Sequence, residues 1–443
     1  MITVSVITKQ YGKRIAVEDM TFDVAAGRIN GVRRPERCRE VEHHAREVIE
    51  VLMSRRISST VGSIDSVLVG RRRSRPDSAA QVARTARLKK TIIRREAVMR
   101  SQRQHAAMGG DGNSTATAGS TMRAIVQDTY GSAEVLRLAR IIRPKVADNE
   151  VLLRVHAAGL SRGSWHLMTG RPYLLRLGFG IRRPKNPVAM GDVAGTVVAV
   201  GSAVTRFSAG DEVFGFGKGA FAEYTAARED KLARKPVNAT LEQAAVVPVS
   251  AITALRAVCD VGNVQQGQKV LITGASGGVG SYAVQLAKAF GAQVTGVCGT
   301  TKLDLVRSLG ADHVIDYTRD DFADGVHHYD LIVDIAGNPG LSRLRRALTP
   351  TGTAVLVGGE EGENLTGGMG RQLRALALSR FVGQRLTGFI PKESSIDLER
   401  LTDLIEAGKV TPSIDRTYPL DQVPEAMRHL AAGMARGKVA ITV

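Results

Sequence analysis

Apolar and polar positions in residues 122–443 follow two different rhythms. In the first part, short apolar runs such as 151–160 and 193–201 are separated by glycine, proline and charged turns. This spacing is typical of short strands in a partly open β-barrel. From about Gln268, strand-like runs alternate with helical segments; these runs are 269–273, 293–297, 313–317, 330–337 and 353–359. The alternation predicts an α/β domain, a doubly wound parallel sheet with helices on both faces.

The segment GASGGVG at 274–280 follows the first of these strands and opens a helical pattern. Apolar residues then recur at the spacing of one helix face, which we expect to lie on the sheet; they are Ala283, Leu286, Ala287 and Phe290. Small residues at a helix N-terminus let the backbone approach a phosphate, which the helix dipole attracts. The loop therefore predicts a dinucleotide site that comprises Ala275, Ser276, Gly277, Gly278, Val279 and Gly280.

The end of the second strand indicates which dinucleotide binds. NAD-binding sites commonly have an acidic residue there, which holds the ribose hydroxyls. This chain has Thr300, Thr301 and Lys302 instead. A carboxylate would repel a 2′-phosphate, whereas hydroxyl and ammonium groups bind it. We therefore expect NADP(H) as the cofactor, with NAD(H) as the weaker ligand.

Composition excludes several classes of protein. No apolar run reaches about 18 residues and the N-terminus lacks the apolar core of a signal peptide, so we expect a cytoplasmic protein with no membrane partner. Cys38, Cys259 and Cys298 are too widely separated for a disulfide framework or a cysteine-based zinc cluster. The strand-like runs 416–420 and 437–443 end the chain, and we expect them to return to the first domain.

The net charge of +18 is concentrated near the N-terminus. Residues 1–121 contain 23 Lys and Arg against 12 Asp and Glu, whereas residues 122–443 contain 38 against 31. A basic run at 71–103 would suit a nucleic acid, but no aromatic residue is interleaved for base stacking. We therefore expect a basic, poorly structured extension at 33–121 that ends in a flexible linker, and no nucleic-acid partner.

Residues 1–32 resemble the opening strands of an ABC transporter ATPase subunit. The P-loop that should follow is absent, because residues 33–44 contain neither its glycines nor its Lys-Ser/Thr pair. Reading the codons for 32–44 one base later permits a Walker A motif, so we hypothesise a shifted reading frame near Val32. An ordinary basic extension is the alternative. Under the first hypothesis, Met122 is the start of the working protein.

Residues 122–443 as a whole resemble the medium-chain dehydrogenase/reductase superfamily, in its zinc-independent quinone oxidoreductase branch. The motifs that carry the resemblance include AGDEVFGF, GAFAEY, QAAVVPVSAITAL, GASGGVG, LGADHVIDY and the terminal GKVAITV. The resemblance implies a GroES-like barrel domain at 122–246 and 386–443, interrupted by the Rossmann domain at 247–385. It also implies a homodimer.

The resemblance also implies roles for residues of the cofactor site. In this branch alanine commonly replaces the first fingerprint glycine, so Ala275 does not count against binding. Lys302 and Tyr317, fifteen positions apart, match a pair at the 2′-phosphate side, and Thr253 matches a position near the nicotinamide. The remaining implied cofactor contacts are Val357, Gly358 and Lys438.

Zinc-dependent relatives use a cysteine and a Gly-His-Glu unit, and this chain has Ser161 and Gly191-Asp192 at those places. We therefore expect no zinc and no other metal. The candidates for catalysis are Ser161 and His166; His166 either donates a proton or packs beside Trp165. Zinc-free relatives often have Asn, Asp and Tyr where this chain has Ser161, Ser164 and His166, so the substrate does not carry over directly.

The function expected is hydride transfer from NADPH to a small-molecule quinone or α,β-unsaturated carbonyl. The cofactor carries the chemistry, and the protein aligns the reactants and excludes water. Two alternatives stay open: an alcohol dehydrogenase of the zinc type, which the missing zinc ligands oppose, and a non-catalytic protein that binds or senses NADPH.

Overall fold

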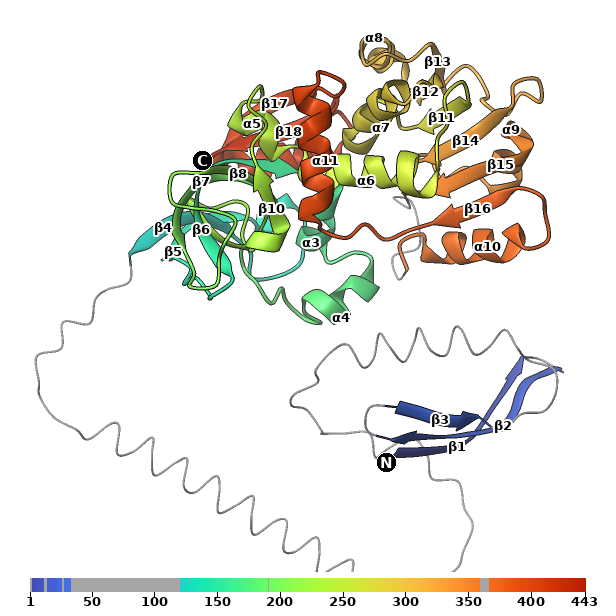
Figure 1. Cartoon of the computed structure of the whole chain (residues 1–443), viewed down its shortest axis with the longest axis horizontal. Coiled ribbons are helices and arrows are strands. Elements are labelled where there is room, and N and C mark those ends of the chain that lie inside the picture. The colour runs from blue at the N-terminus through green and yellow to red at the C-terminus, as the bar shows by residue number, and fades with distance from the viewer. Residues whose placement is uncertain (1, 12–13, 26–27, 33–119, 190, 359–365) are drawn as a thin grey trace, which may run out of the picture. The chain divides into compact units, whose positions relative to one another are not determined.

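The computed structural model describes residues 2–11, 14–25, 28–32, 120–189, 191–358 and 366–443 (Figure 1). The chain divides into two units, residues 1–113 and 114–443. In the first unit, an antiparallel sheet is formed by β1 (Ile2–Tyr11), β2 (Arg14–Ala25) and β3 (Arg28–Val32). The expectations for residues 33–119 lie outside the described part of the chain.

The barrel domain is built around the long strand β6 (Glu150–Leu160), which pairs with three neighbours. The sheet order is β10-β8-β7-β6-β18-β17, and β9 also pairs with β6. These strands are β7 (Gly191–Val200), β8 (Glu212–Gly217), β9 (Tyr224–Arg228), β10 (Leu232–Arg234), β17 (Ile414–Pro419) and β18 (Lys438–Thr442). A separate pair is formed by β4 (Thr121–Val126) and β5 (Arg137–Ile142). Since β18 pairs with β6, the end of the chain returns to the barrel as expected.

Short helices join and cover the barrel strands. They are η1 (Ala133–Val135), α3 (Arg162–Thr169), η2 (Tyr173–Leu175), α4 (Arg176–Phe179), η3 (Glu229–Lys231), α5 (Leu241–Ala245), η6 (Leu420–Gln422) and α12 (Val423–Ala431). No helix in the described part of the chain is both long enough and apolar enough to cross a membrane.

The Rossmann domain contains a six-stranded parallel sheet in the order β13-β12-β11-β14-β15-β16. Its strands are β11 (Lys269–Thr273), β12 (Gln293–Cys298), β13 (His313–Asp316), β14 (Tyr329–Asp334), β15 (Leu348–Leu356) and β16 (Arg385–Gly388). The expected domain boundary at 385–386 falls inside β16, which continues this sheet. The strand order reverses between β11 and β14, and ligands of such sheets bind at the carboxyl ends beside this point.

Helices lie on both sides of the parallel sheet (Figure 1). They are α6 (Pro248–Leu255), the π-helix η4 (Arg256–Val261), α7 (Gly278–Ala289), η5 (Thr300–Lys302), α8 (Leu303–Ser308), α9 (Leu341–Ala347), α10 (Met369–Ser379) and α11 (Ser395–Glu406).

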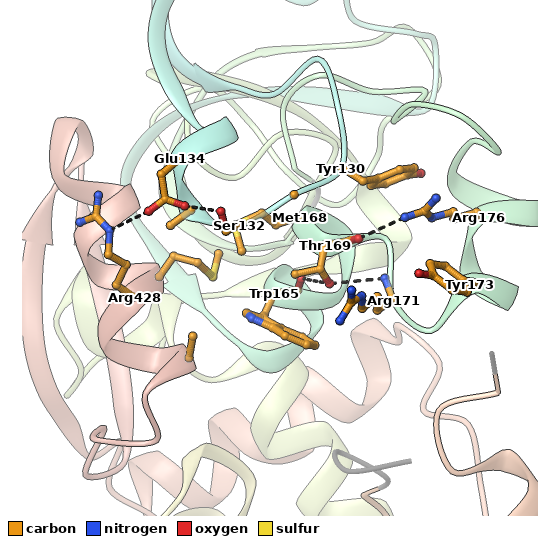
Figure 2. Close-up of a pocket in the computed structure, with 14 residues that line it drawn as sticks. Tyr130, Ser132, Glu134, Trp165, Met168, Thr169, Arg171, Tyr173, Arg176 and Arg428 are labelled. Carbon is orange, nitrogen blue, oxygen red and sulfur yellow. Dashed lines mark hydrogen bonds and ion pairs between the residues drawn. The ribbon is translucent and has the colours of Figure 1, made fainter. Parts of the chain in front are cut away.

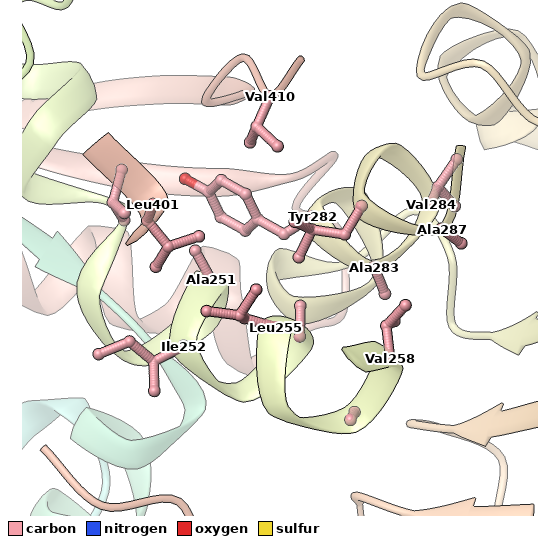
Figure 3. Close-up of a cluster of buried hydrophobic side chains, with 14 of the residues drawn as sticks. Ala251, Ile252, Leu255, Val258, Tyr282, Ala283, Val284, Ala287, Leu401 and Val410 are labelled. Carbon is pink, nitrogen blue, oxygen red and sulfur yellow. The ribbon is translucent and has the colours of Figure 1, made fainter. Parts of the chain in front are cut away.

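Helices α6, α7 and α11 meet around Tyr282, whose ring is fully buried among Ala251, Leu255 and Leu401 (Figure 3). The Tyr282 hydroxyl donates to Val246 O at 3.2 Å, so burying this polar group leaves no unmade hydrogen bond. This cluster holds the first turns of α7, and with them the glycine-rich loop, against the body of the domain.

The expected apolar face of α7 is buried at three of its four positions, Ala283, Leu286 and Ala287. The expectation was wrong for Phe290, which is 40% exposed. Phe290 is the C-cap residue, and its backbone has left the helical conformation (φ −91°, ψ 10°). Helix periodicity therefore no longer sets the direction of its side chain.

Candidate functional site

The glycine-rich loop connects β11 to α7 at the carboxyl edge of the parallel sheet. Gly274 has φ +66°, which favours glycine, and the amide of Gly277 donates to Gly274 O at 3.0 Å to close the turn. A Cβ on Gly280 would lie 2.1 Å from Gly274 O, so no side chain fits there. The first-turn amides of α7 have no acceptor within the helix. The loop therefore presents unpaired N–H groups, at the positive end of a helix dipole, in the arrangement that binds a pyrophosphate.

Lys438 lies against this loop and is almost completely buried. A Cβ on Gly278 would approach Lys438 Cδ to 3.0 Å. The Lys438 ammonium donates to Leu160 O and Ser250 Oγ, both at 3.0 Å, and burial lowers its pKa. These bonds join β18, β6 and α6 beneath the loop, and the direct contact between Lys438 and the cofactor stays a prediction.

Asp192, the buried neighbour of Lys438, has two carboxylate oxygens in different surroundings. Its Oδ1 accepts from Val249 N at 3.2 Å. Its Oδ2 lies 3.9 Å from Lys438 Nζ and accepts no hydrogen bond from the described residues. Burial raises the pKa of Asp192 to about 7, although the nearby Lys438 opposes the shift. This carboxylate contributes to the packing between the two domains through β7, α6 and β18.

The turn at the end of β12 brings together the residues expected at the 2′-phosphate. Tyr317 is 64% exposed and lies beside the turn, since a Cβ on Gly299 would be 3.5 Å from its hydroxyl. The Lys302 ammonium, however, donates to Gly433 O and Ala435 O, both at 2.8 Å, and burial lowers its pKa. Two of its three N–H donors are thus used by the barrel domain.

Arg436 is a charged group at the same turn that sequence reasoning missed. Its guanidinium donates to Thr301 O at 3.0 Å and to the Asp304 carboxylate at 2.6 Å. Together Lys302 and Arg436 connect the loop before β18 to the turn after β12, and they concentrate positive charge there. The only sequence signal was that Arg436 immediately precedes the terminal GKVAITV motif.

Val357 and Gly358 lie at the carboxyl end of β15, where their amides both donate to Asp334 O, at 2.9 and 3.2 Å. The Asp334 side chain is buried, accepts from Thr273 Oγ1 at 3.0 Å and forms an ion pair with Arg371 at 2.6 Å. Burial raises the pKa of Asp334, and Arg371 opposes the rise. This pair, which sequence reasoning also missed, fixes the end of β14 to α10.

On the barrel side, Ser161 caps α3, where its Oγ accepts from Ser164 N at 3.4 Å. A Cβ on Gly191 would lie 3.9 Å from Ser164 Oγ, which is itself 3.4 Å from Ser161 Oγ, so the two places at which zinc-dependent relatives have ligands lie near each other. Neither Ser161 nor Gly191 has a nitrogen or sulfur side chain to coordinate zinc. In the described part of the chain, no three His, Cys, Asp or Glu side chains lie together as a metal site would require.

His166 and Thr253 occupy two different helices. The His166 and Trp165 rings form a T-shaped pair with centroids 5.1 Å apart, and His166 Nδ1 lies 2.7 Å from Arg171 O. Because a carbonyl only accepts, Nδ1 carries the proton. The Thr253 hydroxyl donates to Val249 O at 2.7 Å within α6, and its side chain is buried. Both geometries are compatible with packing, and the roles of the two residues stay predictions.

A pocket of about 440 Å³ lies beside α3, between η1, η2 and α12 (Figure 2). Its wall includes Trp165, Tyr130 and Tyr173, with Arg176 and Arg428 at its polar edges. None of the sequence-predicted site residues lines it. The pocket is therefore distinct from the glycine-rich loop and offers an aromatic surface on the barrel domain.

Two family models match the chain: "Zinc-binding dehydrogenase" over residues 309–441 and "Alcohol dehydrogenase GroES-like domain" over residues 147–237. A mouse protein named "NAD(P)H oxidoreductase RTN4IP1, mitochondrial" is 33% identical over 366 residues, which are 75% of this chain and 92% of that protein. The tomato "2-methylene-furan-3-one reductase" is 34% identical over 340 residues, and the match covers 73% of this chain and 79% of the tomato protein.

Among solved structures, a quinone oxidoreductase from Coxiella burnetii superposes with a TM-score of 0.65 at 28% identity, and covers 73% of this chain and 100% of its own. These similarities confirm the expected fold, a GroES-like domain with a Rossmann domain. The expected resemblance of residues 1–32 to an ABC ATPase has no support from the comparisons.

Proposed function

We propose that this chain, which belongs to the quinone oxidoreductase branch of the medium-chain dehydrogenase/reductase superfamily, reduces quinones or α,β-unsaturated carbonyls with NADPH and without zinc. The observation that carries the proposal is the pair Ser161 and Gly191, which leaves no ligand set for a Lewis acid among the described residues beside α3. An unactivated ketone needs a Lewis acid, because hydride addition places a full negative charge on the carbonyl oxygen. A quinone or enone delocalises that charge through its own conjugated system.

The proposed cofactor site follows the carboxyl edge of the parallel sheet. The first-turn amides of α7, from Gly278 onward, would hold the pyrophosphate, and the close packing of Gly280 against Gly274 O keeps the turn tight enough for this approach. Lys302 and Arg436 would bind the 2′-phosphate through charge-assisted hydrogen bonds. NADPH, when bound, supplies the hydride. The chain itself orients both reactants and keeps water away from them.

The two acceptor classes place different demands on the protein. A reduced quinone oxygen takes its proton from solvent, whereas an enone must also receive a proton on carbon. His166 is the candidate donor, since the bond from Nδ1 to Arg171 O fixes the orientation of its ring. We therefore expect His166 to matter for enones and much less for quinones.

A substrate panel tests the proposal. Purified protein should oxidise NADPH in the presence of a benzoquinone, a naphthoquinone or an enone, and should leave a saturated ketone unreduced. Chelators should not change these rates, and primary alcohols should not reduce NADP. Stoichiometric zinc whose removal abolishes turnover would instead indicate an alcohol dehydrogenase, and NADPH binding without turnover of any acceptor would indicate a binding protein.

A further inference from the structure

Residues 173–185 form an exposed surface that the proposed chemistry does not use. Five large apolar side chains in η2, α4 and the turn after them are each more than a third exposed; they are Tyr173, Leu174, Leu177, Phe179 and Ile181. Leu177 and Ile181 reach 65% and 69% exposure. A single exposed apolar residue is common on soluble proteins, but five within nine positions form a cluster of the kind found at interaction sites.

This segment is held in one conformation by polar contacts on its inner side. The Arg176 guanidinium lies between the rings of Tyr130 and Tyr173, at 4.5 and 4.7 Å from their centroids, and donates to Gly170 O at 2.9 Å. The Tyr130 hydroxyl donates to Gly180 O at 2.7 Å. The apolar side chains are thus exposed by a preorganised backbone, so little conformational entropy is lost when they bind a surface.

The charge around the segment has one sign. Between Glu150 and Asp192 the sequence contains seven Lys and Arg and no acidic residue. Arg182, Arg183 and Lys185 follow the apolar side chains directly and are all exposed. Within the described residues, none of these three forms a salt bridge. Their positive charge is therefore available to an anionic surface.

We propose that residues 173–185 bind the surface of a lipid bilayer that carries anionic headgroups. Apolar side chains that enter the headgroup boundary, flanked by basic side chains that remain among the phosphates, are the two components of interfacial binding. Each basic side chain close to an anionic bilayer strengthens binding about fivefold. The proposal revises our expectation of no membrane partner, which rested on the absence of a long apolar run.

The segment shares Tyr173 and Arg176 with the pocket beside α3 (Figure 2). A bilayer bound by residues 173–185 would therefore lie next to the pocket. α4 belongs to the barrel domain, and Pro172, directly before η2, packs against Gly367, just before the start of α10.

Tryptophan fluorescence provides the direct test in the full chain. Trp165 is the one native tryptophan and gives the baseline. Leu177→Trp places a reporter in the segment, and Leu373→Trp places a matched reporter on α10, where Leu373 is 64% exposed. With phosphatidylglycerol-containing vesicles that carry brominated acyl chains, the Leu177→Trp signal should be quenched well beyond the baseline. The Leu373→Trp signal should not, and equal quenching of the two would overturn the proposal.

Vesicle co-sedimentation tests the charge requirement. Arg182→Glu with Arg183→Glu should weaken partitioning onto phosphatidylglycerol vesicles at least tenfold. The matched control reverses two exposed arginines elsewhere, Arg374→Glu with Arg380→Glu. Both double variants keep the basic N-terminal residues, so any contribution of these residues to vesicle binding cancels when the two variants are compared. If the two double variants lose the same affinity, or if the wild type does not bind these vesicles at low salt, residues 173–185 are not a lipid-binding surface.

Discussion

Lys438 Nζ lies 3.9 Å from Asp192 Oδ2, and both side chains are almost completely buried. The pair connects the first residue of β18 to β7, directly behind the glycine-rich loop. Burial shifts the two groups in opposite directions, since it raises the pKa of Asp192 to about 7 and lowers the pKa of Lys438. Each charge is therefore tolerated mainly because the other is present.

This pair predicts a pH-dependent effect of Lys438→Met. Because folding raises the pKa of Asp192, this carboxyl group stabilises the fold at pH values below its pKa in the unfolded chain. The stabilisation is lost as the pH rises through about 7, the pKa in the folded protein. Without the cation, the ionised Asp192 carboxylate is unpaired, so the free energy of unfolding should fall by about 3 kcal/mol at alkaline pH. The loss should be smaller at mildly acidic pH, where Asp192 is protonated. Denaturant unfolding at both pH values measures this, with the exposed Lys409→Met as control; a loss independent of pH would contradict it.

Lys302→Glu should lower the affinity for NADPH much more than the affinity for NADH. One charge-assisted hydrogen bond to the 2′-phosphate is equivalent to about 1.5–3 kcal/mol, or roughly ten- to a hundredfold in affinity. Binding titrations with both dinucleotides measure the difference. Because Lys302 also bonds Gly433 O and Ala435 O, unfolding must be followed in parallel, and wild type that binds both dinucleotides equally would refute the assignment.

The glycine-rich loop provides a matched pair of substitutions. Gly280→Ala would place Cβ 2.1 Å from Gly274 O, so the loop must shift and cofactor binding should be lost or the protein strongly destabilised. Gly277→Ala meets only Gly274 O within the protein, at 3.4 Å, and should leave the stability of the cofactor-free protein nearly unchanged. Thermal unfolding and dinucleotide titration of both variants measure this, and similar behaviour of the two would be inconsistent with the geometry.

His166→Ala should reduce enone turnover more than quinone turnover. The reason is that only the enone requires a proton from the protein on carbon. A general acid contributes about a hundredfold or more, so the enone rate should fall by at least tenfold while the quinone rate stays within a few-fold. Steady-state rates with both acceptors measure the ratio. If both rates stay unchanged, His166 serves only to pack against Trp165.

A chain that begins at Met122 should fold and bind dinucleotide as the full chain does. The described residues of the second unit begin at residue 120, and β4 loses only its first residue, Thr121, by this truncation. Circular dichroism and cofactor titration compare the two chains. Loss of cofactor binding in the shorter chain would mean that the N-terminal residues have a structural role.

Local patterns in the sequence were sufficient to predict the kind of fold in the two domains, though not the boundary at 385–386, and the loop between β11 and α7. Strand and helix periodicity depend on which side of each element faces the core, and this is visible in the spacing of apolar residues. The glycines at 274–280 were equally readable, since a positive φ and close backbone contacts exclude other residues. The same local rule failed at Phe290, where the helix ends and its periodicity no longer applies.

The contacts that complete the candidate site were decided only by the tertiary structure. Lys438 meets Asp192, Lys302 meets Gly433 and Ala435, and Asp334 meets Arg371, in each case from a different part of the chain. Burial then sets the charge state of these groups, because a carboxylate or an ammonium group removed from water changes its pKa according to the partner it meets. The sequence determined by itself which groups were available, and folding determined which of them face one another, because an ion pair depends on distance in space and not along the chain.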